Sequence, residues 1–306
     1  MKFIQPTVEW WPQETIAQQI AKVGRICYKS KQKEPPADLT EDERKEFIED
    51  NANKLCRRFW KSGHCSMYRH GSAYFFIKHE NKLPRWIWEY FKASPFIDCV
   101  VQNNKVWIST NMQFLCEHDN ILKFLDDYGI DEQEFIDKAM QYKCPEALML
   151  LRMTMAVTTQ ISTTRELNRT SPNNIAEQST RYVNMKKKGG VQIATPHWFQ
   201  GGVPTLTPLK HRLARLVFRT ACKFSEWMYL LLLKLGLQPQ DARGVLPLDA
   251  YSVVAYTYNL YEWKHIIDLR YHGTTGTPHP NAQIAAEQIS EIINSRLQEY
   301  VPEFEI

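Results

Sequence analysis

Apolar side chains stand three or four positions apart near the start of the chain, at Ile16, Ile20, Val23 and Ile26. On a helix with 3.6 residues per turn, this spacing gathers them on one face. We therefore predict that the first substantial element is a helix buried along one side, which ends near Cys27.

A second helix is predicted after Thr40. Thr40 followed three residues later by Glu43 forms a capping-box pattern, in which each side chain bonds the backbone N–H of the other residue. Apolar positions continue at helical spacing to Phe59, and Gly63 is placed to end the helix. The following segment, His64–His70, is expected to be a loop.

The predicted strands are recognised by apolar residues at every second position, a shorter spacing than in the helices. Apolar and polar residues alternate over residues 151–158, which predicts a half-buried strand, and a short helix over Ile161–Asn168 is expected after it. Ala73–Lys78 and Lys105–Asn111 also have the character of strands, and a Trp-rich segment over Pro84–Phe96 separates them.

The C-terminal half is predicted to be mostly helical. The longest helical pattern covers His211–Leu235, after a Pro- and Gly-rich connection, and Gly236 is placed to cap it. Further helices are predicted over Leu248–Trp263 and Asn281–Tyr300.

No internal repeat and no linker-like segment divides the sequence. Residues 1–306 are therefore predicted to form one mixed α/β (α+β) domain, with residues 84–143 as an insertion or elaboration within it. An apolar content of 43% is enough for the substantial core of such a domain.

Charge and composition narrow the functional classes. A net charge of +4 suits small anionic ligands and is low for a protein that coats nucleic acid, so no nucleic-acid partner is expected. The most apolar run, Trp227–Leu235, is shorter than the roughly 20 residues that span a bilayer, so no membrane partner is expected. Seven scattered cysteines without a CxxC pair indicate reduced thiols and a cytoplasmic location. The nine histidines form no metal-binding motif, and no metal site is predicted.

The segment richest in ligand-binding chemistry is Arg165–Tyr182, RELNRTSPNNIAEQSTRY. It combines three arginines with short polar side chains. Arginine presents a fork of donors that matches phosphate oxygens, and neutral polar groups bond base edges or sugar hydroxyls. The residues alone leave two interpretations open: a nucleotide-binding segment, or a solvated helix followed by a polar loop.

The order of residues in this segment resembles a known signature. The triplet Arg169–Ser171, seven further residues and then Ser179–Tyr182 resemble the RHR-x7-S signature of flavin-dependent thymidylate synthases, which often continues into ST-R-Y. Arg165–Leu167 is similar to the HELVR lead-in of one branch of that family. In the triplet, Thr170 and Ser171 replace the usual His and second Arg, so only the first arginine is kept.

Three further segments resemble the same family. Gly63–Ser66, followed by His70, is similar to its GHxS/T…H segment, and Ala242–Pro247 is similar to its ARxVLP segment. Asn259–Arg270 and His279–Gln283 resemble its NLxEWxHFxxLR…HPQ ending. Because these segments extend over most of the sequence, the resemblance covers nearly the whole chain.

This resemblance implies a fold and a reaction. Members of the family have a helix-flanked, mostly antiparallel sheet and assemble as homotetramers. They methylate dUMP at C5 to give dTMP, with FAD as cofactor and with methylenetetrahydrofolate and NADPH as co-substrates. They need no protein nucleophile, and none of the seven cysteines stands in a nucleophile motif.

The resemblance also assigns site residues. Arg270 would stabilise the uracil anion and Ser179 would lie beside the nucleotide, which makes these two the expected catalytic positions. The expected substrate-binding residues are Glu166, Arg169, Glu177, Gln178, Ser179, Arg181, Arg243 and Arg270. The expected flavin-binding residues are His64, Ser66, Arg169, Thr170, Ser171, Glu177, Asn259, His265 and His279. Because the two sets lie on distant segments, each site is expected to combine more than one subunit.

The altered triplet leaves alternatives open. Thr170 and Ser171 remove up to two positive charges, and one charge-assisted hydrogen bond contributes about 1.5–3 kcal/mol. FAD would therefore bind more weakly unless Lys186–Lys188, His197 or a neighbouring subunit compensates. The alternatives are another flavin-dependent C5 modification, such as hydroxymethylation, of a different pyrimidine nucleotide, or a catalytically silent nucleotide-binding homologue.

Overall fold

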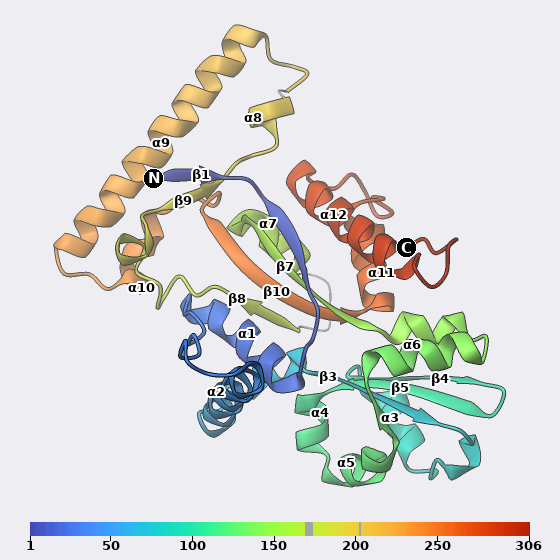
Figure 1. Cartoon of the computed structure of the whole chain (residues 1–306). Coiled ribbons are helices and arrows are strands. Elements are labelled where there is room, and N and C mark those ends of the chain that lie inside the picture. Colours follow the sequence, from blue (N-terminus) through green and yellow to red (C-terminus); the bar gives the residue numbers. More distant parts are fainter. Residues whose placement is uncertain (169–173, 202) are drawn as a thin grey trace.

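The central sheet has the strand order β2-β7-β10-β8, and every neighbouring pair is antiparallel (Figure 1). Its long strands are β7 (Arg152–Gln160) and β10 (Tyr251–Asn259), and its edges are β2 (Thr7–Trp11) and β8 (Ile175–Glu177). This computed structural model describes residues 1–168, 174–201 and 203–306. The expected class, helices around a mostly antiparallel sheet, is confirmed.

Helices cover both faces of the central sheet. α7 (Ile161–Leu167), α11 (Leu260–Arg270) and α12 (Pro280–Leu297) lie on one face and share its apolar core. α1 (Ile16–Tyr28) lies on the other face, against β8 and β10. The helix predicted to end near Cys27 is confirmed.

Because helices cover both faces of the central sheet, β7 is buried on both faces. Met153 and Met155 belong to the core with α11 and α12, whereas Thr154 between them accepts a hydrogen bond from Gln19 of α1 at 2.7 Å. Eight of the nine residues of the strand are buried. The strand predicted over residues 151–158 is confirmed, but its half-buried character is wrong because helices cover both of its faces.

The structure corrects the helix predicted over Leu248–Trp263. Most of these residues form strand β10, and α11 begins only at its end. Aromatic and β-branched residues fill β10 and favour a buried strand. Asn259 then starts α11 with a capping box, because its side chain accepts from the Glu262 N–H and the Glu262 carboxylate accepts from the Asn259 N–H.

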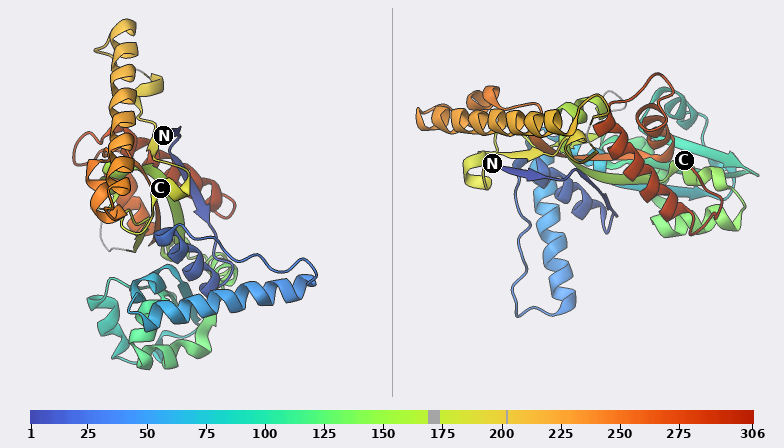
Figure 2. Two further views of the ribbon diagram at one scale, coloured as in Figure 1. Left: turned by 90° about the vertical axis from the view of Figure 1, so that its left-hand side faces the viewer. Right: turned by 90° about the horizontal axis from the view of Figure 1, so that it is seen from above.

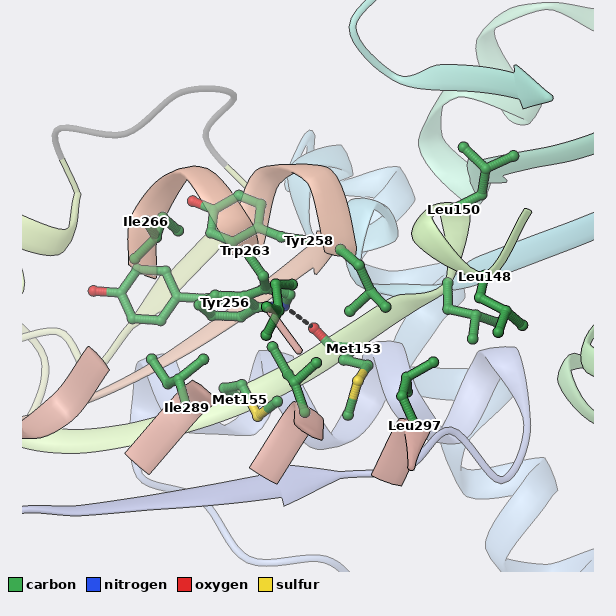
Figure 3. Close-up of a cluster of buried hydrophobic side chains, with 14 of the residues drawn as sticks. Leu148, Leu150, Met153, Met155, Tyr256, Tyr258, Trp263, Ile266, Ile289 and Leu297 are labelled. Atoms are coloured by element: carbon green, nitrogen blue, oxygen red, sulfur yellow. Dashed lines mark hydrogen bonds between the residues drawn. The ribbon is translucent and has the colours of Figure 1, made fainter. Parts of the chain in front are cut away.

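Trp263 fixes α11 in the main core (Figure 3). Its indole ring packs edge-on against Tyr258 and Tyr256, with ring centroids 5.1 and 6.3 Å away. Its Nε1 donates to the backbone oxygen of Met153 at 3.0 Å. A buried indole whose N–H is bonded combines apolar burial with a satisfied donor. This packing sets the orientation of α11 and thereby the position of Arg270 at its end.

A second antiparallel sheet, with the order β4-β5-β3-β6, lies beside the central one, at the lower right of Figure 1. The two strands predicted over residues 73–78 and 105–111 are its members β3 and β5, and three aromatic residues from these strands reach into the main core. Whether this unit is an insertion in a single domain stays a prediction. Its elements are β3 (Ser72–Ile77), α3 (Ile87–Ala93), β4 (Ile97–Gln102), β5 (Lys105–Asn111), α4 (Met112–Glu117), α5 (Asp119–Leu125), β6 (Gly129–Ile130) and α6 (Glu132–Gln141).

Two long helices project from the body (Figure 2). α2 (Glu41–Lys61) starts with the predicted capping box at Thr40, and Gly63 follows it with φ of +76°. α9 (Pro208–Lys234) is followed by Gly236 with φ of +104°, as predicted. Six large apolar side chains are exposed along α9, and we call them the α9 stripe: Leu209, Leu213, Leu216, Val217, Phe224 and Trp227.

The remaining elements are short. The segment His64–His70, predicted to be a loop, contains a 3-10 helix. All seven cysteines are free, and within the described ranges no helix has the length and apolar character needed to cross a membrane. The remaining short elements are β1 (Lys2–Ile4), β9 (Gln192–Ala194), α8 (Trp198–Gly201), α10 (Pro239–Ala242), η1 (Cys65–His70), η2 (Glu80–Lys82), η3 (Asp126–Tyr128), η4 (Pro145–Leu150), η5 (Met185–Lys188) and η6 (Arg243–Val245).

Candidate functional site

A cavity of about 420 Å³ opens where α1, η1, α7 and the segment after β8 meet. Small-molecule sites typically measure about 300–1,000 Å³, so this volume is sufficient for a ligand. The predicted site residues that line it are His64, Ser66, Glu177, Gln178, Ser179, Arg181 and Arg243. Residues that are far apart in the sequence therefore meet within one chain.

The backbone of residues 177–179 is fixed between β10 and the end of α1. Glu177 pairs with Val254 in the antiparallel ladder, and the next N–H, from Gln178, donates to Val253 at 2.9 Å. The N–H of Ser179 then donates to the backbone oxygen of Cys27 at 3.1 Å. The signature segment is thus held in place before it reaches the cavity.

Two hydroxyl groups hold the carboxylate of Glu177. Ser252 Oγ donates to its Oε1 at 2.8 Å, and Thr164 Oγ1 lies 3.1 Å from the same oxygen. The second oxygen, Oε2, has no protein partner among the described residues. Glu177 therefore presents one oriented oxygen that can accept a hydrogen bond from a ligand.

Ser179 and Gln178 make local contacts. The Oγ of Ser179 accepts from the Arg181 N–H at 3.2 Å, which is the serine turn that a loop residue forms with its own backbone. The Gln178 side chain is buried, and its Oε1 accepts from the hydroxyl of Tyr251 at 3.3 Å. Both residues shape the wall of the cavity.

Three arginines of the described residues line the cavity. Arg243 donates from Nη1 to Thr180 Oγ1 at 2.6 Å, and the guanidinium of Arg181 lies 5.2 Å from the centroid of the Tyr182 ring. The third is Arg165 of α7, whose side chain has no hydrogen bond or ion pair within the described part of the chain. Guanidinium groups beside neutral donors and aromatic rings suit a ligand with phosphate and a planar base.

One cysteine, Cys27, also lines the cavity. Burial raises the pKa of its thiol, and the nearby carboxylate of Glu177 raises it further. Because the thiolate is the nucleophilic form, Cys27 is a poor nucleophile at neutral pH.

Some lining residues were missed by sequence analysis, including Cys27, Tyr28, Thr164 and Arg165. Arg165 stands in the lead-in to the signature, which was the available signal for it. Tyr28 packs against Tyr182 with ring centroids 5.5 Å apart. It ends an ordinary amphipathic helix, so no local pattern marks it as part of a site.

Other predicted residues lie away from this cavity. Arg270 donates from Nε to the backbone oxygen of Glu166 at 3.1 Å, and neither residue lines the cavity. Asn259 caps α11, and its Nδ2 donates to Asp98 at 2.9 Å. His265 is exposed on α11, and His279 caps α12. Their assigned roles stay predictions.

The residues of the altered triplet, Arg169, Thr170 and Ser171, lie outside the described residues. His64 and Arg181 line the same cavity of one chain, and the expectation that each site combines more than one subunit stays a prediction.

The family model described as thymidylate synthase complementing protein matches residues 104–303, about two thirds of the chain. The chain belongs to this family. Its resemblance to the flavin-dependent thymidylate synthases is thus confirmed at the level of the family. The matched range includes the signature segment, Arg243 and Arg270, whereas His64 and Ser66 precede it and join the site through the fold.

Two solved structures are similar to this member of the family. PolB, a UMP/dUMP methylase from Streptomyces cacaoi, bound with 5-Br UMP, is 17% identical, with 96% of this chain and 91% of that chain covered and a TM-score of 0.46. PolB bound with 5-Br dUMP is 16% identical, with 100% and 98% covered and a TM-score of 0.45. Among curated proteins, no relative matches the sequence.

Proposed function

We propose that this chain is a flavin-dependent thymidylate synthase, which methylates dUMP at C5 to give dTMP. FAD is its cofactor, methylenetetrahydrofolate is the one-carbon donor and NADPH is the reductant. The supporting observation is the cavity, where seven residues expected from the family motifs meet inside a chain that belongs to the family. Its guanidinium groups, polar donors and aromatic rings fit a phosphate-bearing nucleotide.

Nucleotide binding follows from the charged groups of the cavity. Arg181 and Arg243 bind the phosphate through charge-assisted hydrogen bonds. The Oε2 of Glu177, which has no protein partner in the described part of the chain, accepts a hydrogen bond from a hydroxyl or N–H of the nucleotide. Arg270 stabilises the ionised uracil ring and so raises the electron density at C5. Because Arg270 does not line the cavity of its own chain, it acts in this proposal in the cavity of a neighbouring subunit.

The flavin route also agrees with the state of the cysteine. A mechanism that adds a cysteine to the uracil ring requires a thiolate, and burial keeps Cys27 in the thiol form. When bound, reduced FAD supplies the hydride, while His64 and Ser66 offer hydrogen-bonding groups from the edge of the cavity.

We further propose that the working unit is a homotetramer. The α9 stripe is a physical reason for self-association, because it runs along a helix that projects into solvent (Figure 2). Contiguous exposed apolar side chains on a protein surface mark an interaction site. A second copy of the chain that covers this stripe removes it from water.

The proposed activity is tested with the purified protein, dUMP, methylenetetrahydrofolate, FAD and NADPH. Mass spectrometry identifies the product, and each component is omitted in turn as a control. Formation of dTMP only in the complete mixture supports the proposal. A hydroxymethylated nucleotide would establish the alternative C5 modification, and a protein that binds dUMP but neither takes up FAD nor turns over would be the silent homologue.

The altered triplet needs its own experiment. The double variant Thr170→His/Ser171→Arg restores the family pattern, and isothermal titration compares its FAD affinity with that of the unchanged protein. Tighter binding means that Thr170 and Ser171 have simply lost flavin contacts. Weaker binding and lower activity mean that the site has been rebuilt around a different ligand.

A further inference from the structure

The charges of the described residues that line the cavity do not balance one another. Among the described residues, its charged lining groups are the guanidinium groups of Arg165, Arg181 and Arg243 and the carboxylate of Glu177, so three positive charges and one negative charge leave +2 before His64 is counted. No ion pair between Glu177 and any of these arginines is found in the described part of the chain. Such an uncompensated excess favours an anionic ligand.

Arg165 differs from the other two described arginines of the lining in its polar contacts. Arg243 is held by Thr180, and Arg181 lies over the ring of Tyr182. Arg165 instead extends from α7 with no hydrogen bond, ion pair or ring contact among the described residues. Its neighbour Glu166 does not neutralise it, because adjacent residues on a helix point in different directions.

We propose that Arg165 binds the phosphate of a nucleoside monophosphate together with Arg181 and Arg243. A phosphate monoester carries about −1.5 to −2 charges at pH 7, which matches the excess of the cavity. A nucleoside leaves the positive charges unbalanced, whereas a triphosphate exceeds them. Arg165 also supplies a cation in a chain whose signature triplet lacks up to two positive charges of the family pattern. The identity of the base rests on the proposed function, whereas recognition of the phosphate does not.

Calorimetric titration of the full-length protein tests this role. The ligands are dUMP, deoxyuridine and inorganic phosphate, and the proteins are the unchanged chain, Arg165→Ala, Arg165→Lys and a control, Arg85→Ala. Arg85 is an exposed arginine beside α3, remote from the cavity. We expect Arg165→Ala to weaken dUMP binding about 10- to 100-fold and to leave deoxyuridine binding unchanged. Arg165→Lys should recover part of the loss, and Arg85→Ala should bind dUMP normally.

Two results would overturn the role of Arg165. One is an unchanged dUMP affinity in Arg165→Ala, and the other is an equal loss of affinity for dUMP and for deoxyuridine. FAD and riboflavin are titrated in parallel, and a loss confined to FAD would assign Arg165 to the flavin phosphates instead. If the unchanged chain binds neither dUMP nor inorganic phosphate, the proposed function fails together with this role. If it binds dUMP and the variant binds it equally well, only the role of Arg165 fails. Thermal unfolding confirms that each variant is folded.

Discussion

Arg270 is joined to Glu166 by a hydrogen bond of 3.1 Å from its Nε to the backbone oxygen. The bond connects the end of α11 with α7, the helix that also brings Thr164 and Arg165 to the cavity. A guanidinium has five N–H donors, and in the described structure no other protein group takes up the rest of this fork. Arg270 is therefore anchored and still able to bind a ligand.

We expect Arg270→Ala to lower turnover by at least about 100-fold, because an interaction that grows toward the transition state is lost. The affinity for dUMP should fall much less. Loss of the bond to Glu166 itself costs about 0.5–1.5 kcal/mol, so the unfolding temperature changes little. Steady-state kinetics and dUMP titration check both expectations. Arg270→Lys is the comparison variant, because lysine keeps the positive charge but lacks the forked donors of a guanidinium. Near-normal turnover of Arg270→Ala would exclude the role.

A second prediction concerns Ser252, which does not line the cavity but donates to Glu177 at 2.8 Å. In Ser252→Ala, the carboxylate of Glu177 keeps only one hydroxyl partner among the described residues, Thr164. The Thr164 hydroxyl is also 3.0 Å from the backbone oxygen of Ile161, so it is divided between two acceptors. We expect dUMP to bind about 2- to 10-fold more weakly, because Glu177 is then less well oriented to accept a hydrogen bond from the nucleotide.

The matched control for Ser252→Ala is Ser109→Ala. Ser109 is also a buried serine on a strand, but it belongs to the second sheet and its Oγ has no partner among the described residues. Equal dUMP affinities for the two variants, measured by titration, would show that Ser252 does not orient Glu177.

A third prediction concerns stability and pH. Burial raises the pKa of Glu262 from 4.5 to about 7, and Arg152 and the hydrogen bond to Asn259 oppose this shift only in part. The folded protein therefore keeps a proton that the unfolded chain has lost between about pH 4.5 and 7. The free energy of unfolding falls as the pH rises through this window. The contribution is about 1–3 kcal/mol.

Glu262→Gln tests this because its amide oxygen can still accept from the Asn259 N–H but cannot ionise. Urea unfolding should show the variant gaining stability relative to the unchanged protein as the pH rises from 5 to 8. Glu43→Gln is the control, since Glu43 has the same place in the capping box of α2 but lies in solvent with a lowered pKa. A stability difference for Glu262→Gln that does not vary with pH would contradict the prediction.

Helices that bury only one of their faces could be predicted from the sequence. In α1 and α9 the apolar spacing and the terminal residues marked the element and its end. The sequence predicts a helix where β10 lies, because β10 is buried on both faces and neither alternation nor a glycine separates it from α11. The available signal was Asn259 followed three residues later by Glu262, a capping-box pattern inside the apolar run.

The site was predictable where family motifs mark it and unpredictable where tertiary contacts build it. The motifs identified His64, Arg181 and Arg243, which the fold brings to one cavity. Cys27 and Tyr28 join them through the packing of the end of α1 against this segment, where the N–H of Ser179 bonds the backbone oxygen of Cys27. A long-range contact of this kind leaves no local periodicity in the sequence.

A fourth prediction concerns the α9 stripe. The double variant Leu213→Glu/Leu216→Glu places two charges on side chains that are 58% and 61% exposed in the single chain. Because these side chains already face solvent, the fold of the chain should be little affected, but burial in a subunit interface becomes unfavourable. Light scattering should show a smaller native mass than for Val101→Glu, a control at an exposed position on β4. An unchanged mass would place the subunit contacts elsewhere.

The last prediction concerns which subunit supplies Arg270. Arg181 lines the cavity of its own chain, whereas Arg270 lies away from it, at the end of α11. If Arg270 completes the site of a neighbouring subunit, mixing inactive Arg181→Ala with inactive Arg270→Ala restores sites that carry neither lesion. Random exchange of equal amounts yields about a quarter of such sites. His64→Ala mixed with Arg181→Ala is the control, because both residues line one cavity and every site then keeps a lesion. Activity recovered in the first mixture alone supports a shared site, and activity in neither mixture after verified subunit exchange would show that one chain supplies all these residues.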